Sequence, residues 1–111
     1  MEDREILELF RQRDQRAIPA LEERYGGRLR ALSLRLLGSP EDAEECVSDT
    51  YSRCWDTMPP QRPMSLRAYV GAIVRNLSIS RYRAQRAQKR YNGAEVLLSE
   101  LADCVPAPDS T

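Results

Sequence analysis

The feature that most constrains the fold of this chain is an apolar repeat in its second half. Six apolar residues follow the spacing i, i+3, i+4, i+7, i+8 and i+11: Leu66, Tyr69, Val70, Ile73, Val74 and Leu77. This spacing places all six side chains on one side of an α-helix, whereas a β-strand sends neighbouring side chains to opposite faces. An amphipathic helix needs a partner to cover its apolar side, so the pattern predicts packed helices.

Helical spacing recurs in the rest of the chain, with no convincing strand or repeat. We predict helices over residues 3–12, 14–37, 39–58 and 65–90. The expected fold class is all-α, a compact bundle of about four helices with a C-terminal linker. The helical domain is expected to cover residues 1–93, and residues 94–111 are expected to begin an interdomain linker.

Residues that start and stop helices support these boundaries. Asp14, Ser39 and Ser65 are placed to cap helix starts, and Pro40 follows Ser39 in the first turn, where proline is favoured. Gly38 and Asn92-Gly93 are placed to end helices.

Composition excludes several classes of site. The chain has no histidine and three cysteines, Cys46, Cys54 and Cys104, with no CxxC pair. We therefore expect no disulfide framework, no metal or cofactor site and no catalytic mechanism that needs an imidazole base. The acidic N-terminus is unlike a signal peptide, and no apolar run is long enough to span a membrane, so the expected location is the cytoplasm.

The charge of the chain reverses abruptly near residue 57. Residues 40–56 hold six acidic side chains and one basic one, whereas residues 57–94 hold no Asp or Glu. The basic residues of the second stretch are Arg62, Arg67, Arg75, Arg81, Arg83, Arg86, Lys89 and Arg90. The order suggests an adaptor that offers an acidic element to a basic protein and a basic element to nucleic acid.

One side of the third predicted helix is acidic. At 100° per residue, five polar residues lie opposite its apolar stripe: Asp42, Glu45, Asp49, Ser52 and Asp56. We refer to these five as the acidic face. The acidic face is either a solvated surface or a docking strip for an Arg/Lys-rich element, and its nearly uniform charge favours docking.

The fourth predicted helix carries basic residues away from its apolar stripe, with Asn76 and Ser78 as neutral hydrogen-bonding groups and Tyr82 as an outward aromatic. These side chains suit phosphates, base edges and unpaired bases respectively. The alternative is an exposed basic helix end, which the helix dipole also favours. Trp55, Tyr69 and the two cysteines of the third helix are interpreted as core residues.

Three segments together resemble the second conserved region of sigma-70-family RNA polymerase sigma factors, and most of all the extracytoplasmic-function group. The segments are LEERYGGRLRAL from Leu21, LLGSPEDAEECVSDTYSRCW from Leu36, and LRAYVGAIVRNLSISRYR from Leu66. The likeness covers about residues 5–90. It implies a non-enzymatic helical bundle that works on its polymerase in transcription initiation.

The resemblance also implies partners for both charged surfaces. The acidic face would dock on the clamp helices of the largest subunit of core RNA polymerase. The fourth helix and the loop before it would open and bind the non-template strand of the −10 promoter element, and the loop of residues 61–65 would border a pocket for a flipped base. The expected DNA contacts are Gln61, Arg62, Ser65, Arg67, Arg75, Asn76, Arg83 and Arg86. An anti-sigma factor is a further partner that the resemblance allows.

The chain departs from the family pattern at two positions. Ser80 stands where the family often has Asp, and Tyr69 stands where it often has Trp. The helix-turn-helix domain for the −35 element is not expected within this chain. Two other functions stay open: a stand-alone helical DNA-binding regulator, and a helical bundle that binds proteins without binding DNA.

Overall fold

The computed structural model describes the backbone of residues 1–92 and the side chains of residues 1–89. Over this part the protein is all-α, with α1 (Asp3–Arg11), α2 (Ala17–Leu37), α3 (Pro40–Thr57) and α4 (Leu66–Asn92). The predicted fold class is confirmed. The predicted linker, and Cys104 within it, lie outside the described residues.

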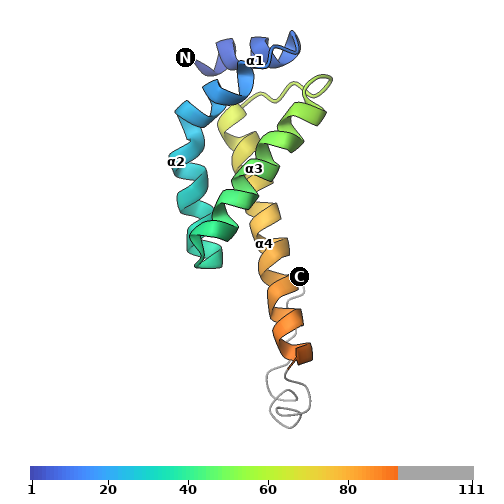
Figure 1. Ribbon diagram of the computed structural model, residues 1–111. Coiled ribbons are helices and arrows are strands. Elements are labelled where there is room, and N and C mark those ends of the chain that lie inside the picture. Colours follow the sequence, from blue (N-terminus) through green and yellow to red (C-terminus); the bar gives the residue numbers. More distant parts are fainter. Residues whose placement is uncertain (93–111) are drawn as a thin grey trace.

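Helices α2, α3 and α4 pack against one another, and α1 lies across one end of this bundle (Figure 1). Helix α4 continues past the opposite end, so its last turns lack the neighbours that cover the rest of the helix. Within the described residues no helix is long and apolar enough to cross a membrane.

Side chains at helical spacing form the core. The most deeply buried large residues come from all four helices and the residue after α3: Ile6, Phe10, Leu21, Val47, Met58, Leu66, Val70 and Val74. Tyr69, Ile73 and Leu77 are partly buried and pack around this core. Cys46 and Cys54 are free thiols inside it, as predicted.

Local hydrogen bonds fix most helix ends where the sequence placed them. The Ser39 hydroxyl accepts from the Asp42 N–H at 3.3 Å, and the Ser65 hydroxyl accepts from the Ala68 N–H at 3.1 Å. Gly38 ends α2 with a φ of +73°, in the left-handed region that favours glycine. These caps hold α3 and α4 in register for the surfaces described below.

The predicted cap of α2 is wrong. Asp14 does not cap the helix, which begins at Ala17 with Arg16 in the cap position. The Asp14 carboxylate instead accepts from the Arg16 N–H at 2.9 Å, and the Asp14 carbonyl accepts from the Ala17 N–H at 3.0 Å. The aspartate thus closes the tight turn between α1 and α2, a local bond that competes with helix capping.

Candidate nucleic-acid and partner interfaces

The acidic face lies on the outer side of α3, but its two halves have different surroundings. Glu45, Asp49, Ser52 and Asp56 are exposed, whereas Asp42 is half-buried. The difference arises because the first turns of α3 pack beside the middle of α4, as the ion pairs between the two helices show.

Arg81 of α4 forms ion pairs with both carboxylates in the first half of the acidic face and offsets part of their charge. Its Nη2 lies 2.5 Å from a Glu45 carboxylate oxygen and 3.3 Å from one of Asp42. Gln85, one turn further along α4, donates to Asp42 at 2.7 Å. Partial burial lowers the pKa of Arg81, but the hydrogen bond that Arg81 donates to Glu45 and the charges of both carboxylates raise it. The acidic and basic elements therefore also bind each other.

The second half of the acidic face is open. Within the described residues, the side chains of Asp49, Ser52 and Asp56 make no hydrogen bond or ion pair. A groove of about 510 Å³ adjoins this half. Its lining combines apolar and polar side chains from α3, the start of α2 and the turn before α2: Gln15, Ile18, Ser48, Tyr51, Ser52, Trp55 and Asp56. The combination suits a partner segment with both cationic and apolar side chains.

A polar network on the other side of α3 holds this helix on α2. Arg30 bridges Glu22 at 2.7 Å and Glu44 at 2.5 Å, and the Tyr51 hydroxyl donates to Glu22 at 2.5 Å. Burial, followed by the bond to Glu22, raises the pKa of Tyr51, while the bond to Arg30 lowers that of Glu22. With one side of α3 tied to α2, its outer side keeps a fixed orientation.

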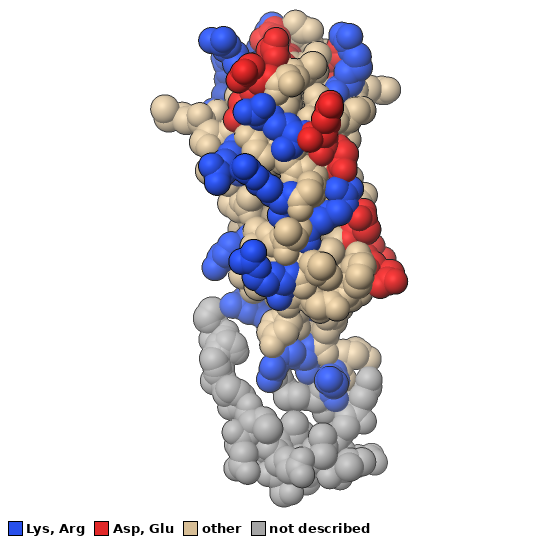
Figure 2. Space-filling model, turned by 90° about the vertical axis from the view of Figure 1, so that its left-hand side faces the viewer, with Lys and Arg blue, Asp and Glu red and all other residues tan. Residues whose placement is uncertain are grey.

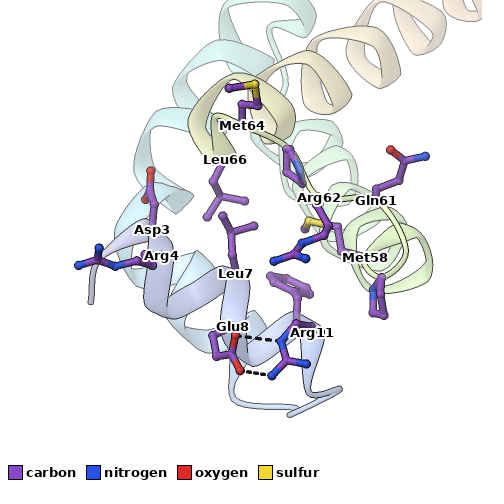
Figure 3. Close-up of a pocket in the computed structure, with 13 residues that line it drawn as sticks. Asp3, Arg4, Leu7, Glu8, Arg11, Met58, Gln61, Arg62, Met64 and Leu66 are labelled. Carbon is purple, nitrogen blue, oxygen red and sulfur yellow. Dashed lines mark hydrogen bonds and ion pairs between the residues drawn. The ribbon is translucent and has the colours of Figure 1, made fainter.

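A pocket of about 560 Å³ lies between α1 and the loop of residues 58–65 (Figure 3). We call the segment of residues 58–65 the 58–65 loop. Leu7 and Leu66 line the pocket from opposite sides, and Arg62 extends from the loop toward α1. Glu8 and Arg11 form an ion pair at its edge, which with a bond from Gln12 lowers the pKa of Glu8 to about 2. The pocket thus offers apolar walls and several guanidinium groups.

The basic and neutral polar residues predicted to contact DNA lie on the surface of the 58–65 loop and of α4. The exposed members are Gln61, Arg62, Ser65, Arg67, Arg75, Asn76, Arg83 and Arg86. Arg86 donates to the hydroxyl of the exposed Tyr82 at 3.0 Å. Figure 2 shows basic side chains over the middle and lower part of one face, with acidic side chains near the top and along one edge.

Ser78 does not belong to this surface, contrary to its predicted exposure. It is fully buried, and its hydroxyl is hydrogen-bonded to that of Ser33 at 2.7 Å. The reason is its place in the i+4 row of Leu66, Val70 and Val74, which continues the core side of α4. Tyr69 is half-buried, as its core interpretation requires, and its hydroxyl is hydrogen-bonded to Thr57 at 2.6 Å.

Sequence reasoning missed two contributions to these surfaces. It assigned no site residue to α1, which forms one wall of the pocket, and it did not pair Arg81 with α3. The position of Arg81 beside the apolar stripe of α4 was a usable signal for the pairing. Nothing in the sequence of α1 indicates that it faces the 58–65 loop.

A family model described as Sigma-70 region 2 matches residues 21–88, more than half of the chain. The chain belongs to the sigma-70 region 2 family. No curated protein and no solved structure matches the sequence. The sigma region 2 match includes α3, most of α2 and α4, and the 58–65 loop, but not α1.

Membership in the sigma-70 family indicates the general role of this chain. A sigma region 2 takes part in promoter recognition during transcription initiation, works with core RNA polymerase and promoter DNA, and carries out no reaction of its own. Both charged surfaces lie within the matched residues, so each belongs to the sigma region 2 and not to an added segment.

Proposed function

We propose that this sigma region 2 recognises and opens the −10 promoter element while its acidic face is docked on core RNA polymerase. Within the family we assign the chain to the extracytoplasmic-function group, on the motifs quoted above. The observation that carries the proposal is the separation of the two charged surfaces, with open carboxylates on α3 and guanidinium groups on α4 and the 58–65 loop. Its place of action is the cytoplasm, and an anti-sigma factor that covers these surfaces would inhibit it.

The open half of the acidic face is the main docking surface in this proposal. Asp49 and Asp56 are exposed and have no internal partner among the described residues, so a cation from the clamp helices meets a full negative charge. Asp42 and Glu45 contribute less, because they share an ion pair with Arg81 that offsets part of their charge. Ser52 supplies a hydroxyl between the carboxylates.

The 58–65 loop and its pocket would hold an unpaired base. Gln61 and Arg62 line the pocket, and Ser65 fixes the start of α4 at its border. The pocket walls are apolar enough to replace base stacking, and Arg62 suits the adjoining phosphate. Capture of unpaired bases offsets an unstacking cost of a few kcal/mol, so opening needs no ATP.

The exposed side of α4 would hold the strand itself. Arg67, Arg75, Arg83 and Arg86 are suited to phosphates. Arg75 and its neighbour Asn76 would lie at the upstream edge of the opened region. Phosphate contacts hold DNA of any sequence, whereas a shaped pocket distinguishes bases. Substitutions on α4 should therefore change the affinity for all sequences, and substitutions in the 58–65 loop should change base preference.

Fluorescence anisotropy of the polymerase complex over a salt series tests the proposal. Single-stranded non-template −10 DNA should bind to the complex without a duplex. The logarithm of its affinity should fall with the logarithm of the salt concentration, with a slope of about −0.7 for each phosphate contact. Arg75→Ala or Arg83→Ala should weaken binding to DNA of every sequence and make the affinity less dependent on salt. Gln61→Ala should instead change which base is preferred. Asn76→Ala should mainly impair opening.

Two outcomes would reject the proposal. Tight binding to intact duplex without polymerase would indicate a stand-alone regulator, and salt-independent or absent DNA binding would indicate a protein-interaction bundle. Arg28→Glu, an exposed change on α2, serves as the control and should leave all measurements at the parent level.

A further inference from the structure

A single arginine in the turn between α1 and α2 touches the end of α3. Arg13 follows α1 directly after Gln12 and has a φ of +56°, a left-handed conformation that is uncommon for residues other than glycine. Its guanidinium Nη1 donates to the carbonyl of Trp55 at 2.5 Å and to that of Met58 at 3.3 Å. The same group lies over the Trp55 ring, 3.9 Å from the ring centroid.

The C-terminal end of α3 is stabilised by a positively charged hydrogen-bond donor such as this guanidinium. The last carbonyls of a helix have no partner within it and carry partial negative charge, which cations stabilise. The last turn of α3 contains no basic residue, and Asp56 adds a further negative charge there. The carbonyls of Cys54 and Thr57 accept hydrogen bonds from the backbone N–H groups of Met58 and Gln61 respectively. The Trp55 carbonyl accepts its hydrogen bond from the Arg13 side chain.

The position of Arg13 connects the two walls of the pocket. One wall is α1, which ends two residues before Arg13, and Phe10 of this wall packs on Trp55 at a ring distance of 6.3 Å. The other wall begins at Met58, whose carbonyl accepts from Arg13. One side chain therefore sets where the 58–65 loop leaves α3 relative to α1.

We propose that Arg13 is a positioning residue for base recognition: it holds the 58–65 loop against α1 at the width that fits an unpaired base. The inference rests on the proposed function, but Arg13 itself contacts no DNA in it. Arg13 also lies outside the residues that the family model matches.

Two variants separate the side chain from the backbone. Arg13→Gly removes the guanidinium and keeps the left-handed conformation, because glycine adopts positive φ without strain. Arg13→Lys keeps the charge but lacks the planar fork that can stack on Trp55 while donating to carbonyls. Arg28→Ala, an exposed change on α2, is the matched control.

The first arm uses the free protein. Trp55 is the sole tryptophan, so its fluorescence reports the contact directly. We expect both Arg13 variants to shift its emission and to speed hydrogen exchange in the peptide covering residues 58–66 by about threefold to tenfold, the range of one lost hydrogen bond. Exchange at the parent rate in this peptide would overturn the proposal.

The second arm uses the polymerase complex and a set of −10 strands that differ by one base. We expect Arg13→Gly to reduce the ratio between the best and worst base by about threefold to tenfold, with the salt slope unchanged because no phosphate contact is lost. Arg13→Lys should reduce the same ratio to a similar extent, also without a change in the salt slope.

Three results separate this inference from its alternatives. Faster hydrogen exchange in the 58–65 loop without any loss of base discrimination would overturn the inference. A salt dependence of DNA affinity whose slope is smaller by about 0.7 would show that Arg13 binds a phosphate instead. A parent protein without any base preference would reject the proposed function, and hydrogen exchange would then still decide whether Arg13 orders the loop.

Discussion

The two halves of the acidic face on α3 carry similar side chains at the same helical spacing, yet their surroundings differ. Asp42 and Glu45 lie beside α4 and bind Arg81, whereas Asp49 and Asp56 face solvent without an internal partner among the described residues. A helical wheel treats the five positions of the face as equal. The packing of α4 decides which of them can offer their charge to another protein.

The inner side of α3, by contrast, is uniform over both halves. Cys46 and Cys54, one in each half, are both buried, and burial raises the pKa of the Cys54 thiol to about 12. The same helix therefore has one continuous core side and a divided outer side. Four predictions test this distinction, in order of decreasing expected effect.

The largest effect concerns thiol reactivity. At pH 8 the Cys54 thiol stays protonated, since its raised pKa lies far above this pH, and alkylation requires the thiolate. We expect Cys46 and Cys54 to react with iodoacetamide on the order of a thousandfold more slowly than in urea, with both rates limited by unfolding. Peptide mass spectrometry measures the two sites separately. Rapid labelling of Cys54 alone would mean that the second half of α3 is not packed on the core.

The next effect is on polymerase binding. Asp49→Arg should weaken core polymerase binding by about 2 kcal/mol, roughly thirtyfold, because an exposed charge that faces a cation changes sign. The fold should not change, since the Asp49 side chain is exposed and makes no hydrogen bond or ion pair within the described residues. Competition binding with circular dichroism checks both parts. Parent-level affinity in a folded variant would contradict the docking proposal.

A smaller and mixed effect is expected from Glu45→Arg. The new cation would lie beside Arg81, so the free energy of unfolding should fall by about 0.5 kcal/mol, the size typical of exposed ion pairs. Polymerase affinity should fall less than for Asp49→Arg, because Arg81 already offsets part of the charge of Glu45. Urea unfolding and the same competition assay measure the two quantities. A larger loss of affinity than for Asp49→Arg would reverse the ranking of the two halves.

The smallest effect is the coupling between Glu45 and Arg81. A double-mutant cycle with Glu45→Gln and Arg81→Met should give about 0.2–1 kcal/mol, reduced by added salt. Arg81→Met should also increase the contribution of Glu45 to polymerase binding, because its carboxylate becomes available. Zero coupling at low salt would show that the pair does not restrain the acidic face.

Much of the fold followed from local signals in the sequence. The apolar spacing of α4, the Ser39 and Ser65 caps and the terminating Gly38 act over a few residues, so each could be predicted without knowing the tertiary structure. The site residues on helix faces were predicted in the same way, and all of them except the half-buried Asp42 are exposed. Ser78 shows the limit of this reasoning, since the edge of an apolar stripe depends on how closely the neighbouring helix approaches.

The sequence by itself determined the helices, their core sides and the order of an acidic helix before a basic one, because these depend on spacing along the chain. The tertiary structure alone decided which charges meet: Arg81 on Asp42 and Glu45, and Arg13 on the end of α3, contacts between residues 36 to 45 positions apart. Such pairs depend on how helices cross and where turns direct the chain. Hydrogen bonds act over about 3 Å and Coulomb attraction between exposed charges is screened beyond about 10 Å, so the availability of a charged group is set by its neighbours in space.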